Sequence, residues 1–579
     1  MPPETKNCQN CKNDFMIESE DFLFYQKIKV PPPTFCPECR MQRRFMWRNE
    51  RSLYKRDCDL CKKSFISLYP KDSCYTIYCR DCWYSDNWDP IDFGIEYDNL
   101  KSFFELFREL QLKVPRLGIW TVQCTNSPYT NQSYNNKNCY LSYGFRDSED
   151  CMYVARAVNL KKCMDVVYSH YSENLYEAFN VEKSYNTFYS EKSEALIDSY
   201  FVSNSRNISN CFGIINKRNS SYTFMGENLS KDAYLERLKE IDLGSKKIID
   251  EYKKLFDNIK KQSIHKYGNL VSCQNSTGDN LVNTKNSKMV FDGFDLENSR
   301  YSAWVFSSKE IYDCYGMGNS QYVYEAMSPE EVSNTKFVHV VDTSNNVEYS
   351  EMCKGSSFLF GCISLQKKSY CILNKQYTKE EYQILIEKIK EEMNSNPYID
   401  KKNRIYKYGE FFPYDLSPFS YNESTAQEFF PLNKNIALDL CFKWKDDEER
   451  NYRIDLPSQG IPDNIKDVDD TILNNIIGCS HLGKCEHKCT EAFKLTESEL
   501  SFYKKNKIPV PNTCPNCRHY ERLSKRNPMK LWHRSCMCDK EAHMHTNGTK
   551  ECSNEFETSY APDRPEIVYC EGCYNKEVY

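Results

Sequence analysis

A 12-residue repeat organises the chain between Asn138 and Phe224, and it runs without gaps. The repeat places a column of mostly small residues beside a column of large apolar residues. The small column is Cys139, Cys151, Cys163, Leu175, Thr187, Ser199, Cys211 and Thr223, and the large column is Tyr140, Met152, Met164, Tyr176, Phe188, Tyr200, Phe212 and Phe224. A short fixed period without helical 3.6-residue spacing is typical of a β-solenoid. At about 4.8 Å per coil, eight coils predict a rod of roughly 40 Å with the cysteine column in its core.

The same pattern recurs further along the chain at an offset of 148. Leu141, Tyr153, Asp165, Glu177, Tyr189, Phe201, Gly213 and Met225 align with Met289, Tyr301, Asp313, Glu325, Phe337, Tyr349, Gly361 and Leu373. The expected fold is therefore mainly β, with two tandem β-solenoid arrays of about 12 residues per coil at 124–228 and 270–377.

Helical patterns follow both arrays and are expected to cover the open ends of the solenoids. One helical cap is predicted at 229–269, where Ser230 opens the pattern. A second cap is predicted at 378–396, where Thr378 and Glu381 form a capping box.

Two further segments join these parts of the chain. A linker helix is expected within 98–123, opened by Asp98, between the N-terminal region and the first array. Residues 397–478 are rich in Pro and aromatic residues and follow neither periodicity. We expect them to form an irregular, packed connector.

Four CxxC pairs crowd the N-terminal residues 1–97. Each pair supplies two thiolates from one tight turn, and two pairs complete the closed tetrahedral shell of a structural zinc. Joining neighbouring pairs predicts one site made of Cys8, Cys11, Cys36 and Cys39 and another made of Cys58, Cys61, Cys79 and Cys82. A cross-braced arrangement of the same pairs is compatible with this spacing. Residues 1–97 are therefore predicted to form a double zinc module.

Residues 479–579 repeat this arrangement at an offset of 478, which becomes 491 after Cys536. The predicted ligands are Cys485, Cys489, Cys514 and Cys517 in one site and Cys536, Cys552, Cys570 and Cys573 in the other. The residues inserted between these offsets hold Cys538, an alternative to Cys536, and also His543 and His545. Four zinc ions per chain are therefore expected. A closed shell of four thiolates leaves no position for a reacting water, so their role is expected to be structural.

The half-motif CxxCxxxF, followed by a polar stretch ending in Phe-Tyr and then by Pro and CPxCR, runs from Cys8 to Arg40. It recurs from Cys485 to Arg518 with three residues instead of two between its first cysteines. The motif resembles the "probable zinc-ribbon" family of bacterial proteins, and the whole chain resembles large multi-zinc proteins of genome-reduced bacteria. The resemblance covers about 33 residues at each end of the chain and implies a zinc-held knuckle, without an activity.

A basic, aromatic segment lies between the two predicted zinc sites of each module. Residues 40–56 carry a net charge of +6 and residues 518–534 carry +5, whereas the whole chain carries −5. Guanidinium groups and aromatic faces suit phosphates and unpaired bases. The predicted nucleic-acid contacts are Arg40, Arg43, Arg44, Arg48, Arg51, Arg518, Arg522 and Arg526. The alternative is that these arginines pair with acidic neighbours inside each module.

Two carboxylates share one column of the repeat, as Asp165 and Glu177 in the first array and as Asp313 and Glu325 in the second. Carboxylates about 5 Å apart on successive coils can serve as acid and base or bind a cation. A solvated acidic face is the interpretation that we favour, and changing all four to Asn and Gln should then raise stability by about 1 kcal/mol. The sequence has no nucleophile elbow and no phosphate-binding loop, so no catalytic residues are predicted.

The chain has no apolar run long enough for a membrane span, and its polar first residues do not resemble a signal peptide. A cytoplasmic location is therefore expected, where cysteines remain reduced. The expected function is a non-enzymatic, multi-zinc protein that binds RNA or DNA, with the solenoids as spacers. The alternatives are a protein–protein interaction scaffold with purely structural zinc and a carbohydrate-active β-helix enzyme. The expected partner is thus a nucleic acid or a protein, and not a membrane.

Overall fold

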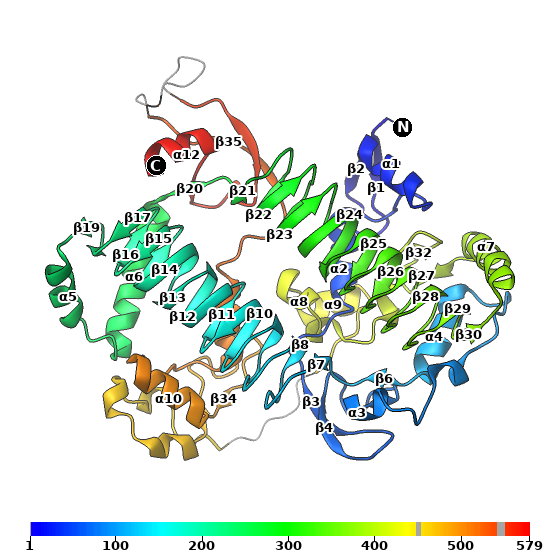
Figure 1. Ribbon diagram of the computed structural model, residues 1–579, viewed down its shortest axis with the longest axis horizontal. Helices are drawn as coiled ribbons and strands as arrows, with labels where there is room; N and C mark the ends of the chain where they lie inside the picture. The colour runs from blue at the N-terminus through cyan, green and yellow to red at the C-terminus, as the bar shows by residue number, and fades with distance from the viewer. Residues whose placement is uncertain (1, 447–452, 541–542, 544–550) are drawn as a thin grey trace.

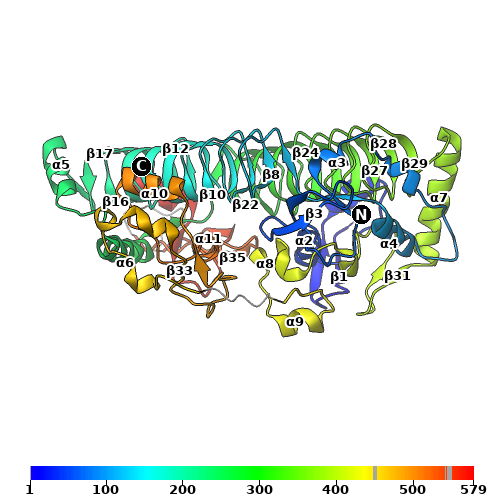
Figure 2. The same cartoon turned by 90° about the horizontal axis from the view of Figure 1, so that it is seen from below.

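The computed structural model describes residues 2–446, 453–540, 543 and 551–579. The protein is mainly β, with 34% of its residues in strands and 24% in helices. Most strands belong to two large, open sheets, which together form one layer of the molecule (Figures 1 and 2). In Figure 2 most of the connector and of the terminal regions lies below this layer.

The first sheet spans residues 121–228 and contains thirteen described strands. They are β7 (Thr121–Val122), β8 (Asn131–Tyr134), β9 (Tyr143–Arg146), β10 (Met152–Lys161), β11 (Met164–Val167), β12 (His170–Glu182), β13 (Tyr185–Phe188), β14 (Glu191–Ser203), β15 (Arg206–Ser209), β16 (Phe212–Ile215), β17 (Arg218–Ser221), β18 (Thr223–Phe224) and β19 (Glu227–Asn228). From β7 to β18 the strands pair in parallel with a 12-residue register, so that Met164 lies opposite Tyr176. The hydrogen-bond register thus follows the period of the sequence.

The second sheet spans residues 270–376 and contains ten described strands. They are β21 (Leu270–Val271), β22 (Gly278–Lys285), β23 (Val290–Glu297), β24 (Ala303–Gly318), β25 (Gln321–Met327), β26 (Ser333–His339), β27 (Asn345–Glu348), β28 (Ser357–Phe360), β29 (Ser369–Ile372) and β30 (Lys375–Gln376). Tyr312 lies opposite Tyr324, which is the same 12-residue register. We call the two stacks of parallel strands, residues 121–228 and 270–376, the first and second array.

Left-handed backbone recurs at every third residue of the first array, from residue 123 to residue 225. Each 12-residue repeat therefore has four such corners, with short extended segments between them. Asn and Asp tolerate a positive φ better than other residues with a side chain. Asn126, Asn138 and Asp150 occupy one column of corners. Their side chains are hydrogen-bonded in a row, because Asn126 Nδ2 donates to Asn138 Oδ1 and Asn138 Nδ2 donates to Asp150 Oδ1, both at 3.0 Å.

Replacing Asn138 with Val should destabilise the first array by about 1–2 kcal/mol, because a β-branched side chain is strained at this residue's φ of 54°. Asn138→Gly also removes the two side-chain hydrogen bonds but accepts the backbone angle, so it is the matched control. Urea unfolding of both variants measures the difference. Equal losses in the two variants would mean that the corner backbone contributes nothing.

The core of each array consists of side chains that point inward between the corners. Cys139, Cys151, Cys163 and Cys211 are at most 1% exposed, so the cysteine column lies in the core as expected. Inward serines satisfy the backbone, since Ser142 Oγ donates to the carbonyl of Tyr140 and accepts from the N–H of Val154. The buried side chains of these two core clusters all come from residues 139–214 in one array and 281–371 in the other. Each array therefore has a core of its own.

The two arrays lie side by side and run in opposite directions (Figure 1). Arg156 Nε donates to Tyr315 Oη at 2.9 Å, and Asn180 Nδ2 donates to Asn280 Oδ1 at 3.1 Å. As the residue numbers rise along one array, those of its contacts in the other array fall.

Four helices lie next to the arrays: α4 (Phe103–Lys113), α5 (Lys231–Lys239), α6 (Lys246–Gln262) and α7 (Lys379–Ser395). Helices α5 and α7 lie at opposite ends of the layer in Figure 2, with Ser230 and Thr378 as their N-caps. Helix α6 instead lies along the first array, where Phe256 contacts Phe201. Helix α4 begins after Ser102 rather than at Asp98, because Ser102 and Glu105 form a capping box there. Each described helix is too short or too polar to cross a membrane.

The two terminal modules share one order of elements. The N-terminal module contains β1 (Glu4–Asn7), β2 (Asp14–Ile17), α1 (Ser19–Lys27), α2 (Pro37–Phe45), β3 (Tyr54–Asp57), β4 (Ser64–Ser67), β5 (Ile77–Tyr78) and α3 (Arg80–Trp83). The C-terminal module contains β33 (Ile477–Gly478), β34 (Ala492–Phe493), α10 (Glu497–Asn506), α11 (Pro515–Leu523), β35 (Trp532–Ser535), β36 (Glu555–Thr558), β37 (Ile567–Tyr569) and α12 (Glu571–Val578). The duplication seen in the cysteine spacing therefore extends to the folded modules.

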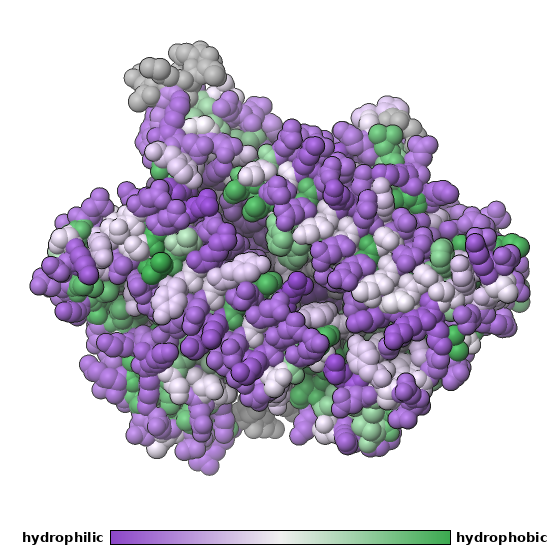
Figure 3. Space-filling model, viewed as in Figure 1, coloured by the Kyte–Doolittle hydropathy of each residue, from purple (hydrophilic) through white to green (hydrophobic). Residues whose placement is uncertain are grey.

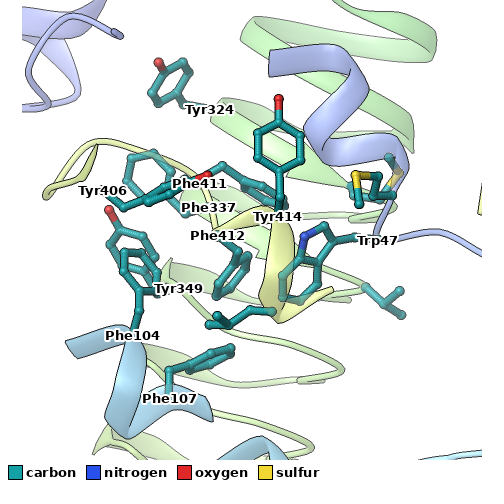
Figure 4. Packing of buried hydrophobic residues seen from close by; sticks show 14 of the residues in the cluster. Trp47, Phe104, Phe107, Tyr324, Phe337, Tyr349, Tyr406, Phe411, Phe412 and Tyr414 are labelled. Atoms are coloured by element: carbon teal, nitrogen blue, oxygen red, sulfur yellow. The ribbon is translucent and has the colours of Figure 1, made fainter. Parts of the chain in front are cut away.

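Short elements make up the segments between these parts. They are η1 (Pro90–Phe93), β6 (Arg116–Leu117), β20 (Ile264–Lys266), β31 (Tyr398–Ile399), β32 (Ile405–Tyr406), η2 (Tyr414–Leu416), η3 (Tyr421–Glu423), α8 (Ala426–Phe429), α9 (Lys434–Asp439), η4 (Ser458–Gly460), η5 (Ile465–Asp467) and η6 (Asp470–Asn474). The aromatic part of the connector is buried between the N-terminal module and α4 (Figure 4). There the Phe412 ring stacks on Trp47 at 4.5 Å and on Phe107 at 4.8 Å between ring centroids. The connector thus contributes to the largest core cluster of the protein.

Candidate metal centres

Two groups of four cysteines form in the N-terminal module. Cys8, Cys11, Cys36 and Cys39 gather at the β1–β2 turn and the start of α2, and Cys58, Cys61, Cys79 and Cys82 gather at the β3–β4 turn and the start of α3. The Sγ atoms of Cys11 and Cys36 are 3.7 Å apart, and those of Cys61 and Cys79 are 3.8 Å apart. Two sulfurs bound to one tetrahedral zinc are about 3.8 Å apart. Both groups therefore fit such an ion.

One cysteine in each group has a lowered pKa, which favours the thiolate, the form of cysteine that binds metal, whereas burial and neighbouring sulfurs raise the pKa of Cys36, Cys39, Cys79 and Cys82. Side-chain hydrogen bonds with Cys36 and Cys39 hold the pKa of Cys8 far below its usual value. The backbone N–H of Lys63 lowers the pKa of Cys61 to about 7. Each group thus offers four closely spaced sulfurs, one of which has a lowered pKa.

The third group differs from the prediction in one ligand. Cys479, Cys489, Cys514 and Cys517 lie together, whereas Cys485 lies in a neighbouring group with His481, His487 and Cys517. The N–H of Cys514 donates to Cys479 Sγ at 3.3 Å, just as the N–H of Cys36 donates to Cys8 Sγ at 3.2 Å. Cys479 therefore takes the place of Cys8. The spacing rule missed it because nine residues, instead of two, separate it from the next ligand.

The fourth group consists of Cys536, Cys552, Cys570 and Cys573. The Sγ atoms of Cys552 and Cys570 are 3.9 Å apart. The alternative ligand Cys538 lies beside this group, with its Sγ 3.1 Å from His543 Nδ1. His545, which also belongs to the inserted residues, is outside the described residues.

The arginines of α2 are buried against the second array. The guanidinium of Arg40 binds Asp313 through two contacts of 2.9 and 3.0 Å. Arg43 and Arg44 each bind Glu325 at 2.8 Å, and Arg44 also lies 3.1 Å from Asp313. Burial is the largest single effect on Arg40 and lowers its pKa, but Asp313, Tyr25 and Tyr324 together outweigh it and raise the pKa of Arg40 well above its usual value.

Helix α11 makes the equivalent contact with the first array. Arg518 Nε lies 2.9 Å from Asp165, and Arg522 Nη1 lies 2.7 Å from the same carboxylate. Glu177 binds Lys253 of α6 instead, at 2.6 Å. Each module thus inserts a basic helix onto the acidic column of one array, and Arg40 and Arg44 correspond to Arg518 and Arg522 at the offset of 478.

Most of the arginines that we predicted to contact nucleic acid are buried. Arg40, Arg43, Arg44, Arg48, Arg518 and Arg522 are all at most 3% exposed, and Arg51 and Arg526 are half-buried. Arg48 binds Glu50 at 2.7 Å, and the Arg526 guanidinium lies 3.8 Å from the centre of the Phe429 ring. Six of the eight guanidiniums therefore have no surface to offer a phosphate in this conformation. The alternative, pairing with carboxylates, describes them better, although their main partners lie in the arrays and not within the modules.

The acidic column is also not a solvated face. Asp165, Asp313 and Glu325 are fully buried, and Glu177 is half-buried. Neutralising them would leave buried guanidiniums without counter-charges, so the small stabilisation expected from the sequence is replaced by an expected loss of stability. Module helices cover Asp165, Asp313 and Glu325, whereas Glu177 lies beside Lys253 of α6.

Each module docks its basic helix on one array, and it also pairs one of its strands with the segment that leads into the other array. Strand β5 of the N-terminal module pairs with β6, which leads into the first array, while its α2 contacts the second array. Strand β37 of the C-terminal module pairs with β20, which leads into the second array, while its α11 contacts the first array. The two modules thus join the arrays in a reciprocal way.

Neither a protein-family model nor a curated protein matches the chain. The function is therefore inferred from the geometry of the molecule alone.

Proposed function

We propose that the protein is a non-enzymatic interaction scaffold with structural zinc, built on two β-solenoid arrays that its terminal modules hold together. The observation that carries this proposal is the mutual burial of the basic helices and the acidic columns. The groups that pointed to nucleic acid or to catalysis are used for internal assembly. The side of the array layer that the modules do not cover is available to a partner.

A solenoid architecture is supported by the 12-residue register of most strand pairs, with an 11-residue register between β21 and β22, and by the four corners in each repeat of the first array. Zinc is supported by the ligand type, because groups of four cysteines with sulfur spacings near 3.8 Å suit a soft, tetrahedral ion. Calcium and magnesium require oxygen ligands, so these groups do not suit them.

Exposed apolar residues on the first array support a protein partner. Tyr171, Tyr185 and Ile197 are 59%, 52% and 48% exposed, and Tyr185 lies opposite Ile197 in the strand register. Figure 3 shows one face of the molecule, on which small hydrophobic areas lie among hydrophilic ones. Apolar anchors surrounded by charged residues are typical of protein interfaces.

The nearby charges give little support to a nucleic-acid partner. Lys137 binds Glu149 at 2.8 Å, and Lys183 binds Glu194 at 2.7 Å, so basic side chains here alternate with carboxylates. Phosphate backbones are bound by clusters of unpaired positive charge.

The variant Tyr185→Ala/Ile197→Ala tests the proposal. Proteins cross-linked to the native protein in its own cells should be lost from this variant but retained by Ile384→Ala, which removes another exposed apolar side chain, on α7. Nuclease treatment before purification should leave the association unchanged. An association that disappears with nuclease, or that both variants retain, would contradict a protein partner on this surface.

A further inference from the structure

We propose that the C-terminal module holds a two-metal cluster, in which the Cys517 sulfur bridges two ions. One ion is bound by Cys479, Cys489 and Cys514, and the second is bound by His481, Cys485 and His487. This inference rests on the proposed metal-binding role of the modules and adds one ion beside the site formed by Cys479, Cys489, Cys514 and Cys517.

The distances around Cys517 place its sulfur in both groups. Its Sγ atom is 3.9 Å from Cys479 Sγ and 3.6 Å from Cys485 Sγ. It is also 3.2 Å from His481 Nδ1. The ligand atoms of each group lie within 4.8 Å of one another, so one sulfur completes two sets of four ligands. A thiolate can share its lone pairs between two ions, and His2Cys2 is a common ligand set for zinc.

Comparison of the two modules shows how the second set arises. In the N-terminal module two residues separate the first two ligands, Cys8 and Cys11, whereas nine residues separate Cys479 and Cys489. The longer loop supplies all three of the additional ligands. In the shorter loop Asn10 Nδ2 donates to the sulfur of Cys39, the equivalent of Cys517, at 3.2 Å. An amide donor in one module is thus replaced by metal-binding side chains in the other.

His487 provides an independent indication of a missing ligand. Its Nδ1 atom is buried and has no hydrogen-bond partner among the described residues. The ring is held in place, because it stacks on Tyr520 at 5.8 Å between centroids and 6° between planes. A buried imidazole nitrogen without a partner costs free energy, and binding an ion removes that cost.

The second ion would also be the more accessible of the two. Cys485 and His487 line a cavity of about 1130 Å³ that lies between this module, the connector and the N-terminal module. Cys479, Cys514 and Cys517 are buried, whereas His481, Cys485 and His487 are half-buried. We therefore expect the second ion to exchange with added metal before the first.

Cobalt substitution of the full-length protein tests the bridge. Two high-spin Co(II) ions that share a thiolate couple antiferromagnetically, so neither contributes fully to the EPR signal. His481→Ala/His487→Ala should lose one cobalt per chain and yet give a stronger EPR signal, because the remaining ion becomes uncoupled. His533→Ala, which removes an exposed histidine of β35, should change neither quantity.

The possible results separate this inference from the proposed function. Unchanged cobalt content in the double variant, or a signal that falls in proportion to the cobalt lost, overturns the bridged cluster while leaving the remaining metal sites intact. A wild-type protein that binds no cobalt or zinc at all overturns both. Hydrogen exchange of α11 checks that the double variant remains folded, and Cys485→Ser, expected to lose the same ion, provides a second variant.

Discussion

Replacing Asp313 with Asn should lower the stability of the unit formed by the N-terminal module and the second array by about 3–5 kcal/mol. The carboxylate makes two contacts with Arg40, and both side chains are at most 1% exposed. Asn keeps the shape of the side chain but removes its charge. The guanidinium of Arg40 then stays buried without its nearest counter-ion, since Glu325 is 4.0 Å away and already binds Arg43 and Arg44. The shift of the urea unfolding transition measures this loss.

Two further variants give this prediction its controls. Asp165→Asn should produce a comparable loss in the other half of the molecule, because Asp165 binds Arg518 and Arg522 in the same way. Glu149→Gln breaks an exposed ion pair with Lys137 and should leave the transition unchanged. An Asp313→Asn protein as stable as Glu149→Gln would show that α2 does not depend on this carboxylate.

Removing the metal should unfold both terminal modules while leaving the strands of the arrays paired. Structural zinc sites contribute about 10–16 kcal/mol to the folding of the small modules that contain them. Without this contribution α2 and α11 should lose their order and withdraw their arginines from the acidic columns. The core clusters of the arrays contain no module residue among their buried members, so the strands keep their own packing.

Hydrogen exchange measured before and after chelation checks this expectation. Peptides covering 37–45 and 515–523 should lose protection, whereas peptides covering 151–167 and 311–327 should keep it. The large residues that the modules cover, such as Tyr176 and Tyr324, should become accessible to a hydrophobic dye. Returning zinc should reverse both effects. Simultaneous loss of protection in all four peptides would mean that the arrays have no independent stability.

The 12-residue repeat was visible in the sequence because it reflects local packing. Side chains at one position of each repeat stack directly on one another, so Cys139, Cys151 and Cys163 occupy the same place in successive repeats. The corners were not predicted, although Asn at positions such as 126, 138, 174 and 186 was a signal for them. Asn also occurs at many positions that are not corners, and this hides the three-residue spacing of the corner positions.

The metal groups were predictable where the ligands follow one another at short, fixed spacing. The N-terminal groups needed only CxxC pairs, and the group at Cys536 followed from the duplication. Cys479 was not predicted, because the loop between it and Cys489 is longer than the equivalent loop of the N-terminal module. An unassigned Cys at the first residue of the module, together with two histidines in the loop, was the available signal.

The partners of the basic helices could not be predicted from the sequence. Arg40 and Asp313 are 273 residues apart, and nothing in either segment shows that the two surfaces meet. Glu410 of the connector, which binds Arg43 at 3.1 Å, was missed for the same reason. Sequence patterns show which residues are charged, whereas the pairing of distant charges depends on tertiary structure.

A double-mutant cycle on Arg522 and Asp165 most directly tests the central claim that the basic helices of the modules serve to dock them on the arrays. The cycle compares Arg522→Met, Asp165→Asn and the double variant by urea unfolding. We predict a coupling free energy of about 2–3 kcal/mol, with the double variant more stable than Asp165→Asn because the buried charge of Arg522 is removed together with its counter-charge, which leaves only Arg518 beside the neutral side chain. Additive effects of the two substitutions, accompanied by loss of nucleic-acid binding in Arg522→Met at low salt, would contradict the claim and return these arginines to a role in phosphate recognition.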